Sequence, residues 1–102
     1  MIYPFNSPYQ YTAYTVEGWN SAVIGVYYCG FLNSNNQLVP LYIGKGTGEG
    51  GIKSRLIDHL RDDYWPDVTH FGFHVCDYIH EADNYEATEI LKYKPRYNKI
   101  GK

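Results

Sequence analysis

The sequence predicts a small α+β domain in which a β-hairpin, a helix, a third strand and a second helix follow one another. Residues 22–31 and 38–43 are rich in β-branched and aromatic side chains, as strands are, and turn-forming residues at 33–36 separate them. Residues 52–62 place their apolar side chains on one arc of a helix, and residues 70–78 alternate as a strand does. The 102 residues suffice for one such domain with a single core.

The first 22 residues are expected to form an aromatic-rich extension before a domain that runs from residue 23 to residue 102. Six aromatic residues lie here among polar and turn-forming residues, which favours a loose arm with at most one short strand. Such rings either cover an exposed edge of the core or stack on unpaired bases.

The two hairpin strands each carry a short aromatic-glycine signature. Gly25-Val26-Tyr27 lies in the first strand and Tyr42-Ile43-Gly44 ends the second, so Tyr27 and Tyr42 are expected on adjacent strands. Pro40 lacks an amide donor, which indicates an edge or an irregularity at that point of the second strand.

The helix predicted for residues 52–62 places Arg55 and His59 one turn apart at the edge of its apolar arc. They are expected to point toward the seam between helix and sheet. The glycine-rich run before it, residues 46–51, satisfies the G-x-G-x-x-G spacing of dinucleotide-binding folds. Those folds need parallel strands joined by crossover helices, so we interpret the run as a connector and expect no nucleotide cofactor.

The second helix, predicted for residues 81–93, is stopped by Lys94-Pro95. On its helical wheel Glu86 falls near the middle of the apolar arc, whereas Glu81 and Glu89 fall toward its rim. A carboxylate aimed at a core must be protonated, paired with an arginine such as Arg55, or bound to a metal ion.

Composition limits the classes of function. No apolar stretch is long enough to span a bilayer and no secretory leader is evident, so we expect a soluble, cytoplasmic protein without a membrane partner. Cys29 and Cys76 lack the spacing of a zinc site and are interpreted as buried thiols. The net charge of -2 argues against a uniformly basic nucleic-acid surface. Basic residues nevertheless crowd the last eleven positions, either as a binding strip or as a solvated tail: Lys92, Lys94, Arg96, Lys99 and Lys102.

Taken in order, the two signatures, Arg55 with His59, and Glu86 before the run Pro95-Arg96-Tyr97-Asn98 resemble the GIY-YIG nuclease superfamily. The resemblance extends from about Val23 to Asn98. It implies a three-stranded antiparallel sheet flanked by helices, with a phosphodiester-cleaving site on one face of the sheet. The family's site residues can be placed on Tyr27, Tyr42, Arg55, His59, Glu86 and Asn98, and Lys45 matches a basic position found in some members.

Phosphodiester hydrolysis requires a nucleophilic water, relief of charge on the phosphoryl oxygens and help for the leaving oxygen. The resemblance implies that Glu86 binds one Mg²⁺ or Mn²⁺ ion, that Arg55 binds the phosphate, and that His59 or Tyr42 takes the proton from water. Tyr27 would hold water or phosphate and Asn98 would fix the geometry. Lys45, Lys94 and Arg96 would contact substrate.

We therefore expect a divalent-metal-dependent endonuclease acting on DNA, preferably single-stranded or structured. Two alternatives stay open on sequence alone: a nucleic-acid-binding module that has lost turnover, and a nuclease that acts on RNA. The oligomeric state and any sequence preference are not legible in the sequence.

Overall fold

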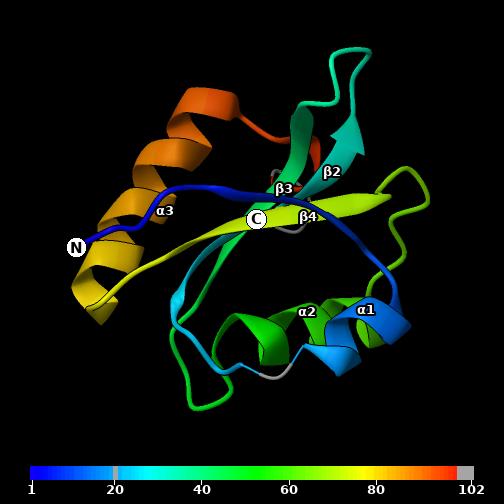
Figure 1. Cartoon of the computed structure of the whole chain (residues 1–102). Coiled ribbons are helices and arrows are strands. Elements are labelled where there is room, and N and C mark those ends of the chain that lie inside the picture. The colour runs from blue at the N-terminus through cyan, green and yellow to red at the C-terminus, as the bar shows by residue number, and fades with distance from the viewer. Residues whose placement is uncertain (20, 99–102) are drawn as a thin grey trace.

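The computed structural model describes residues 1–19 and 21–98 and shows an α+β fold with four antiparallel strands and three helices. The strands are β1 (Asn6–Gln10), β2 (Gly25–Leu32), β3 (Leu38–Gly46) and β4 (His70–Val75), in the spatial order β1-β4-β2-β3. The helices are α1 (Ala13–Gly18), α2 (Gly51–Asp62) and α3 (Ile79–Tyr93), followed by the short 3-10 helix η1 (Arg96–Asn98). Figure 1 shows α1 and α2 side by side on one side of the sheet, with α3 away from them.

The predicted order of hairpin, helix, strand and helix is confirmed, but the expected three-stranded sheet is wrong because β1 adds a fourth strand. β1 pairs with β4, with Tyr9 opposite Phe71. All five residues of β1 are exposed, so the strand lacks the apolar alternation that reveals a strand in a sequence. Pro8 also has no backbone N–H group to donate to a neighbouring strand. The N-terminal segment also forms α1, whose Val16 is fully buried.

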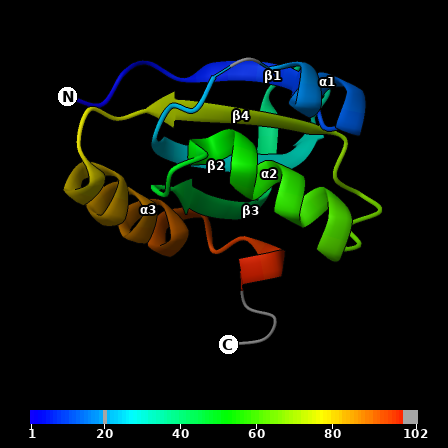
Figure 2. The same ribbon diagram turned by 90° about the horizontal axis from the view of Figure 1, so that it is seen from below.

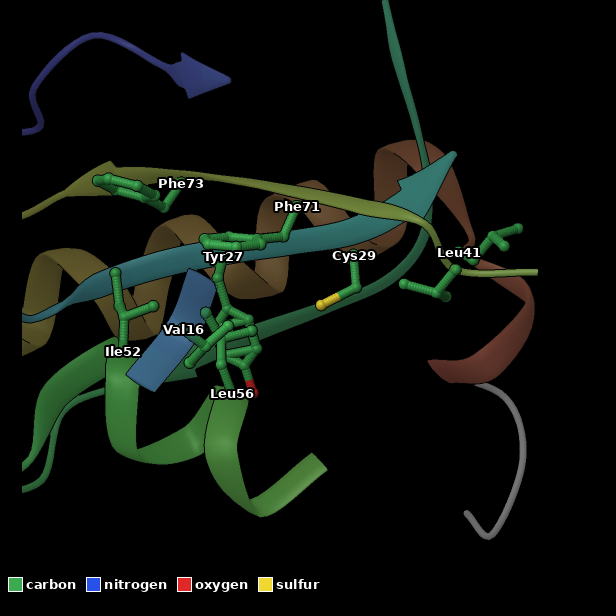
Figure 3. Packing of buried hydrophobic residues seen from close by; sticks show 9 residues of the cluster. Val16, Tyr27, Cys29, Leu41, Ile52, Leu56, Phe71 and Phe73 are labelled. Carbon is green, nitrogen blue, oxygen red and sulfur yellow. The ribbon is translucent and has the colours of Figure 1, made fainter. Parts of the chain in front are cut away.

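The sheet separates two apolar clusters. On the α2 face, Tyr27 packs with Ile52 and Leu56 of α2 and with Phe71 of β4, as Figure 3 shows. On the α3 face, Tyr28 packs with Ile43 and Ala82. Successive residues of a strand point to opposite faces, so the two neighbouring tyrosines of β2 serve different clusters. The cysteines in these clusters, Cys29 and Cys76, are free and buried, as predicted.

The glycine of the Tyr42-Ile43-Gly44 signature leaves space for the tyrosine of the Gly25-Val26-Tyr27 signature. Gly44 of β3 lies opposite Tyr27 of β2. A Cβ atom at Gly44 would lie 2.5 Å from the Tyr27 hydroxyl oxygen and 2.6 Å from the ring carbon that carries it. The ring of Tyr27 therefore occupies the space that a side chain would fill, and only glycine fits without displacing it.

The segment that follows α3 covers the edge strand β3; α3 itself ends at Tyr93. Lys94 takes a left-handed conformation with φ of 47°, and the chain then turns into η1. Figure 2 shows η1 beside β3. The Asn98 side chain pairs with the backbone of Ile43 there, accepting from its amide at 2.8 Å and donating to its carbonyl at 2.8 Å. A side-chain amide thus satisfies part of an open sheet edge.

No helix in the described ranges is long and apolar enough to cross a membrane.

Candidate active site

The first signature tyrosine and the histidine of α2 form a buried hydrogen-bonded pair. The hydroxyl oxygen of Tyr27 lies 2.7 Å from Nε2 of His59, and Nδ1 of His59 lies 2.7 Å from an oxygen of Asp63. An ionised carboxylate can only accept, so the neutral imidazole carries its proton on Nδ1 and accepts the Tyr27 hydroxyl proton at Nε2. Asp63 therefore fixes the tautomer of His59.

Helix α2 positions this pair because its sequence turns one face toward the sheet. Ile52 and Leu56 anchor that face with fully buried side chains, and His59 follows one turn later with only 6% of its surface exposed. Asp63 follows His59 by a further four residues, where the helix ends and its backbone amide bonds the carbonyl of His59. The i, i+4 spacing thus produces the His59 to Asp63 contact.

The environment holds His59 in its neutral form. Burial lowers the pKa of His59 below its usual value and the charge of Arg55 acts in the same direction, whereas the hydrogen bond to Asp63 opposes them. Burial likewise raises the pKa of Tyr27 and Tyr42, so both phenols keep their protons near neutral pH. The site combines neutral proton donors with one neutral imidazole that can accept.

Tyr42 packs beside this pair, closer to solvent. It is half-buried, and its ring centroid lies 4.9 Å from that of His59 and 6.2 Å from that of Tyr27. Burial raises the pKa of Tyr42, and the charge of Arg55 acts against this effect. The ring of Tyr42 therefore adjoins the hydrogen-bonded series of Tyr27, His59 and Asp63.

Arg55 lies beside both phenols, and its positive charge lowers the pKa of each. Its side chain is 45% exposed and pairs with Asp58 one turn along the helix at 3.1 Å. The guanidinium is thus held at the site by its own helix, with part of its surface in solvent.

Glu86 of α3 lies at the border of this cluster. Its side chain is 20% exposed, one of its oxygens lies 3.9 Å from Nζ of Lys45, and its charge raises the pKa of Tyr42. Lys45 also pairs with Asp83 at 2.8 Å. Of these three charged groups, Glu86 is the one whose charge acts on Tyr42, and Lys45 links it to Asp83.

The structure therefore brings together Tyr27, Tyr42, Arg55 and His59, with Glu86 near Tyr42 and Lys45 beside Glu86. Asn98 is placed apart from their side chains and holds the backbone of Ile43, the residue after Tyr42. Arg96 pairs with Asp67 at 2.7 Å, and Lys94 is an exposed helix-capping residue. Lys99 and Lys102 lie outside the described residues.

Sequence reasoning missed three residues. Asp63 was not singled out, although its position four residues after His59 at a helix end is a usable signal. Trp65 was not singled out either, and its ring lies between those of His59 and Tyr97, with centroids at 4.7 and 5.5 Å. Glu89, expected at the rim of its helix, is the more buried carboxylate of α3 and accepts from Tyr28 at 2.6 Å.

The residues present suit at most a sparsely coordinated metal ion. Within residues 1–19 and 21–98, no three His, Cys, Asp or Glu side chains gather as a metal site. Glu86 offers a partly exposed carboxylate next to a phenol. A single hard cation that keeps most of its ligands as water and phosphate is compatible with one such carboxylate.

Comparison with protein-family models, with curated proteins and with solved structures finds no match to this chain.

Proposed function

We propose that this protein is a GIY-YIG-like endonuclease that hydrolyses phosphodiester bonds in DNA with the help of one divalent metal ion. One observation carries the proposal: a hydrogen-bonded chain from Tyr27 through His59 to Asp63, with Tyr42 packed beside His59 and the guanidinium of Arg55 beside both phenols. The sequence signatures that resemble this family supply the residues of this cluster except Asp63.

The chain of hydrogen bonds provides a path for the proton of an attacking water. Tyr27 is fully buried and His59 almost so, whereas Tyr42 is half-buried. We assign to Tyr42 the positioning of the attacking water, whose proton passes to the hydroxyl oxygen of Tyr27. The Tyr27 proton moves to Nε2 of His59 at the same time, and the carboxylate of Asp63 stabilises the imidazolium that forms. Of the two bases that the sequence left as alternatives, His59 then receives the proton and Tyr42 holds the water.

Arg55 supports the same reaction through its charge. A guanidinium donates several hydrogen bonds in a fixed plane and keeps its charge at all relevant pH values. Its exposed part is available to a phosphate next to Tyr42, where it would offset the negative charge that grows on the phosphoryl oxygens.

Glu86 is the residue that would hold the metal ion, and a bound Mg²⁺ or Mn²⁺ would supply Lewis-acid stabilisation of the phosphate and the leaving oxygen. Lys45 already neutralises part of this carboxylate at 3.9 Å. Metal binding would therefore loosen the contact between Lys45 and Glu86 and leave Lys45 paired with Asp83.

The substrate is proposed to be single-stranded or structured DNA. The net charge of -2 offers little general attraction for a long duplex. The described basic residues of the C-terminal strip are few, and one of them, Arg96, is paired with Asp67. A local grip on a flexible strand fits this distribution of charge better.

The test is to incubate the purified protein with end-labelled single-stranded, duplex, branched and RNA oligonucleotides, with Mg²⁺, with Mn²⁺ and with a chelator. We expect metal-dependent cleavage of single-stranded or branched DNA. Glu86→Gln should lower the rate by about a hundredfold or more, since it removes the metal-binding carboxylate at constant size.

Glu49→Gln is the matched control, because Glu49 is an exposed carboxylate of the glycine-rich connector and should tolerate the change. Full activity of Glu86→Gln would disprove the metal assignment. Binding of DNA without cleavage under any metal would instead identify a module without turnover, and preference for RNA would correct the substrate.

A further inference from the structure

A pocket of about 360 Å³ opens beside His59, at the C-terminal end of α2. The rings of Tyr42, Tyr64, Trp65 and Tyr97 line it. Its volume falls in the range of roughly 300–1,000 Å³ that small-molecule sites occupy. Because Tyr42 and His59 belong both to this pocket and to the proposed catalytic site, an occupant of the pocket would lie next to the reacting phosphate.

The lining is a set of nearly parallel aromatic rings. Trp65 stacks on Tyr42 with centroids 4.9 Å apart at 29°, and on Tyr97 with centroids 5.5 Å apart at 17°. Tyr64 lines the same pocket with 85% of its surface exposed, and no other ring in the described ranges packs against it. The pocket therefore combines a rigid aromatic wall with one ring that is open to an additional flat partner.

The charge of the pocket selects against phosphate. Asp62 and Asp63 line it, and no lysine or arginine does. Arg61 pairs with Asp62, and His59 pairs with Asp63, so neither carboxylate is exposed as an isolated charge. Carboxylate oxygens accept hydrogen bonds from amino groups and repel phosphate oxygens, which suits the edge of a base and not the backbone.

We propose that this pocket receives one unpaired nucleobase of a DNA strand, adjacent to the phosphate that is cut. This inference rests on the proposed function and specifies how its substrate is gripped. The base lays its flat face on the exposed ring of Tyr64, next to the aromatic wall that Trp65 forms with Tyr42 and Tyr97, and turns its amino edge toward the carboxylates. A base within a duplex cannot enter, because its faces are stacked and its edge is paired, so the pocket favours single strands and frayed ends.

The test measures binding in the presence of a chelator, so that it does not depend on cleavage. Fluorescence anisotropy compares a labelled single-stranded oligonucleotide, the same strand with abasic positions, and the fully paired duplex. Tyr64→Ala should weaken binding of the normal strand about five- to 150-fold, as expected for the loss of stacking on one base, and should leave the abasic strand unaffected. Tyr64→Phe, which keeps the ring, should bind like the original protein.

Tyr14→Ala is the matched control, because Tyr14 is a 91% exposed tyrosine on α1 that does not line this pocket. Since Tyr64 is itself exposed, its substitution should not impair folding. Equal affinity of Tyr64→Ala and the original protein, an equal loss for normal and abasic strands, or no binding of single strands at low salt would each overturn the inference.

A parallel assay with Mg²⁺ separates this result from the proposed function. Metal-dependent cleavage that is indifferent to Tyr64→Ala would reject the base pocket and leave the endonuclease standing. Base-dependent binding without cleavage would support the pocket and reject the endonuclease.

Discussion

Tyr27 and Tyr28 are neighbours in β2, yet their hydroxyl groups serve different surroundings. Tyr27 donates to an imidazole on the α2 face at 2.7 Å, and Tyr28 donates to the carboxylate of Glu89 on the α3 face at 2.6 Å. Burial raises the pKa of both phenols. The two phenols are therefore alike in burial and in the direction of their pKa change, and they differ in the group that accepts their hydrogen bond.

On the α2 face the acceptor can gain a proton near neutral pH and is backed by Asp63, while Arg55 places a positive charge beside the phenol. On the α3 face the acceptor is the carboxylate of Glu89, which is a weaker base than an imidazole, and Glu89 raises the pKa of Tyr28 further. The first arrangement can pass a proton along. The second stabilises a packed interface between helix and sheet, which shows how neighbouring groups decide whether a buried tyrosine is suited to chemistry.

The most direct way to break this comparison is to remove each hydroxyl in turn. Tyr27→Phe should lower the rate of DNA cleavage by about a hundredfold, because it interrupts the proton path. Tyr28→Phe should leave the rate within about threefold, because its hydroxyl belongs to the other face. Single-turnover rates, measured well below the unfolding temperature of each variant, provide the check. Equal losses in the two variants would show that the faces do not differ in function.

A second variant tests whether the ring of Tyr27 needs the space above Gly44. Gly44→Ala should lower the free energy of unfolding by about 1–3 kcal/mol, because the new methyl group meets the Tyr27 ring and hydroxyl. Chemical denaturation measures the change. Gly48→Ala, in the connector that follows β3 and with no heavy atom within 4 Å of its added Cβ, should change stability by less than about 0.5 kcal/mol. A tolerated alanine at position 44 would contradict the close approach.

The edge of the sheet next to Tyr42 offers a third test. Asn98→Ala removes two hydrogen bonds to the backbone of Ile43 and should cost about 1–2 kcal/mol of unfolding free energy. It should also weaken cleavage several-fold by loosening the strand that carries Tyr42. Asn84→Ala, on the exposed face of α3, is the control and should be nearly neutral. Hydrogen exchange at the Ile43 amide reports the local loosening, and unchanged protection there would contradict the role given to Asn98.

The smallest expected effect is a pH dependence of stability that arises from His59. Its pKa in the folded state is below the unfolded value of about 6.5, so the unfolded chain binds the proton more readily. Stability from this group is complete above about pH 6.5 and is lost as the pH falls from there toward the folded pKa. Denaturation curves between about pH 7.5 and 5 should therefore slope more steeply for the original protein than for His59→Gln. Identical slopes would mean that the folded state does not hold His59 neutral.

Much of the fold was accessible from local patterns. The β-branched and aromatic run around Tyr27, the amphipathic arc that carries Leu56 and the proline after α3 each specify an element through the side chains of that element alone. The sequence allowed one short strand in the N-terminal segment but did not place it, because the residues of β1 are exposed and only their pairing with β4 makes them part of the sheet.

The candidate site was accessible in part for a related reason. Tyr27, Tyr42, Arg55, His59 and Glu86 could be singled out by residue type and order, and the wheel of α2 placed His59 toward the sheet. The wheel of α3 placed Glu89 at the rim, whereas the sheet buries it against Tyr28. A helical wheel gives the direction of each side chain around the helix axis, but it does not predict how the helix is tilted on the sheet.

The sequence by itself determined the hairpin, the strand after it, the two longer helices and the side chains with reactive chemistry, because these follow from short-range spacing and residue type. Only the tertiary structure decided that the hydroxyl of Tyr27 meets His59, that Gly44 makes room for it, and that Tyr64, Trp65 and Tyr97 share a pocket with them. These contacts join residues from separate elements, and their distances depend on how the sheet packs on α2, which no local pattern encodes.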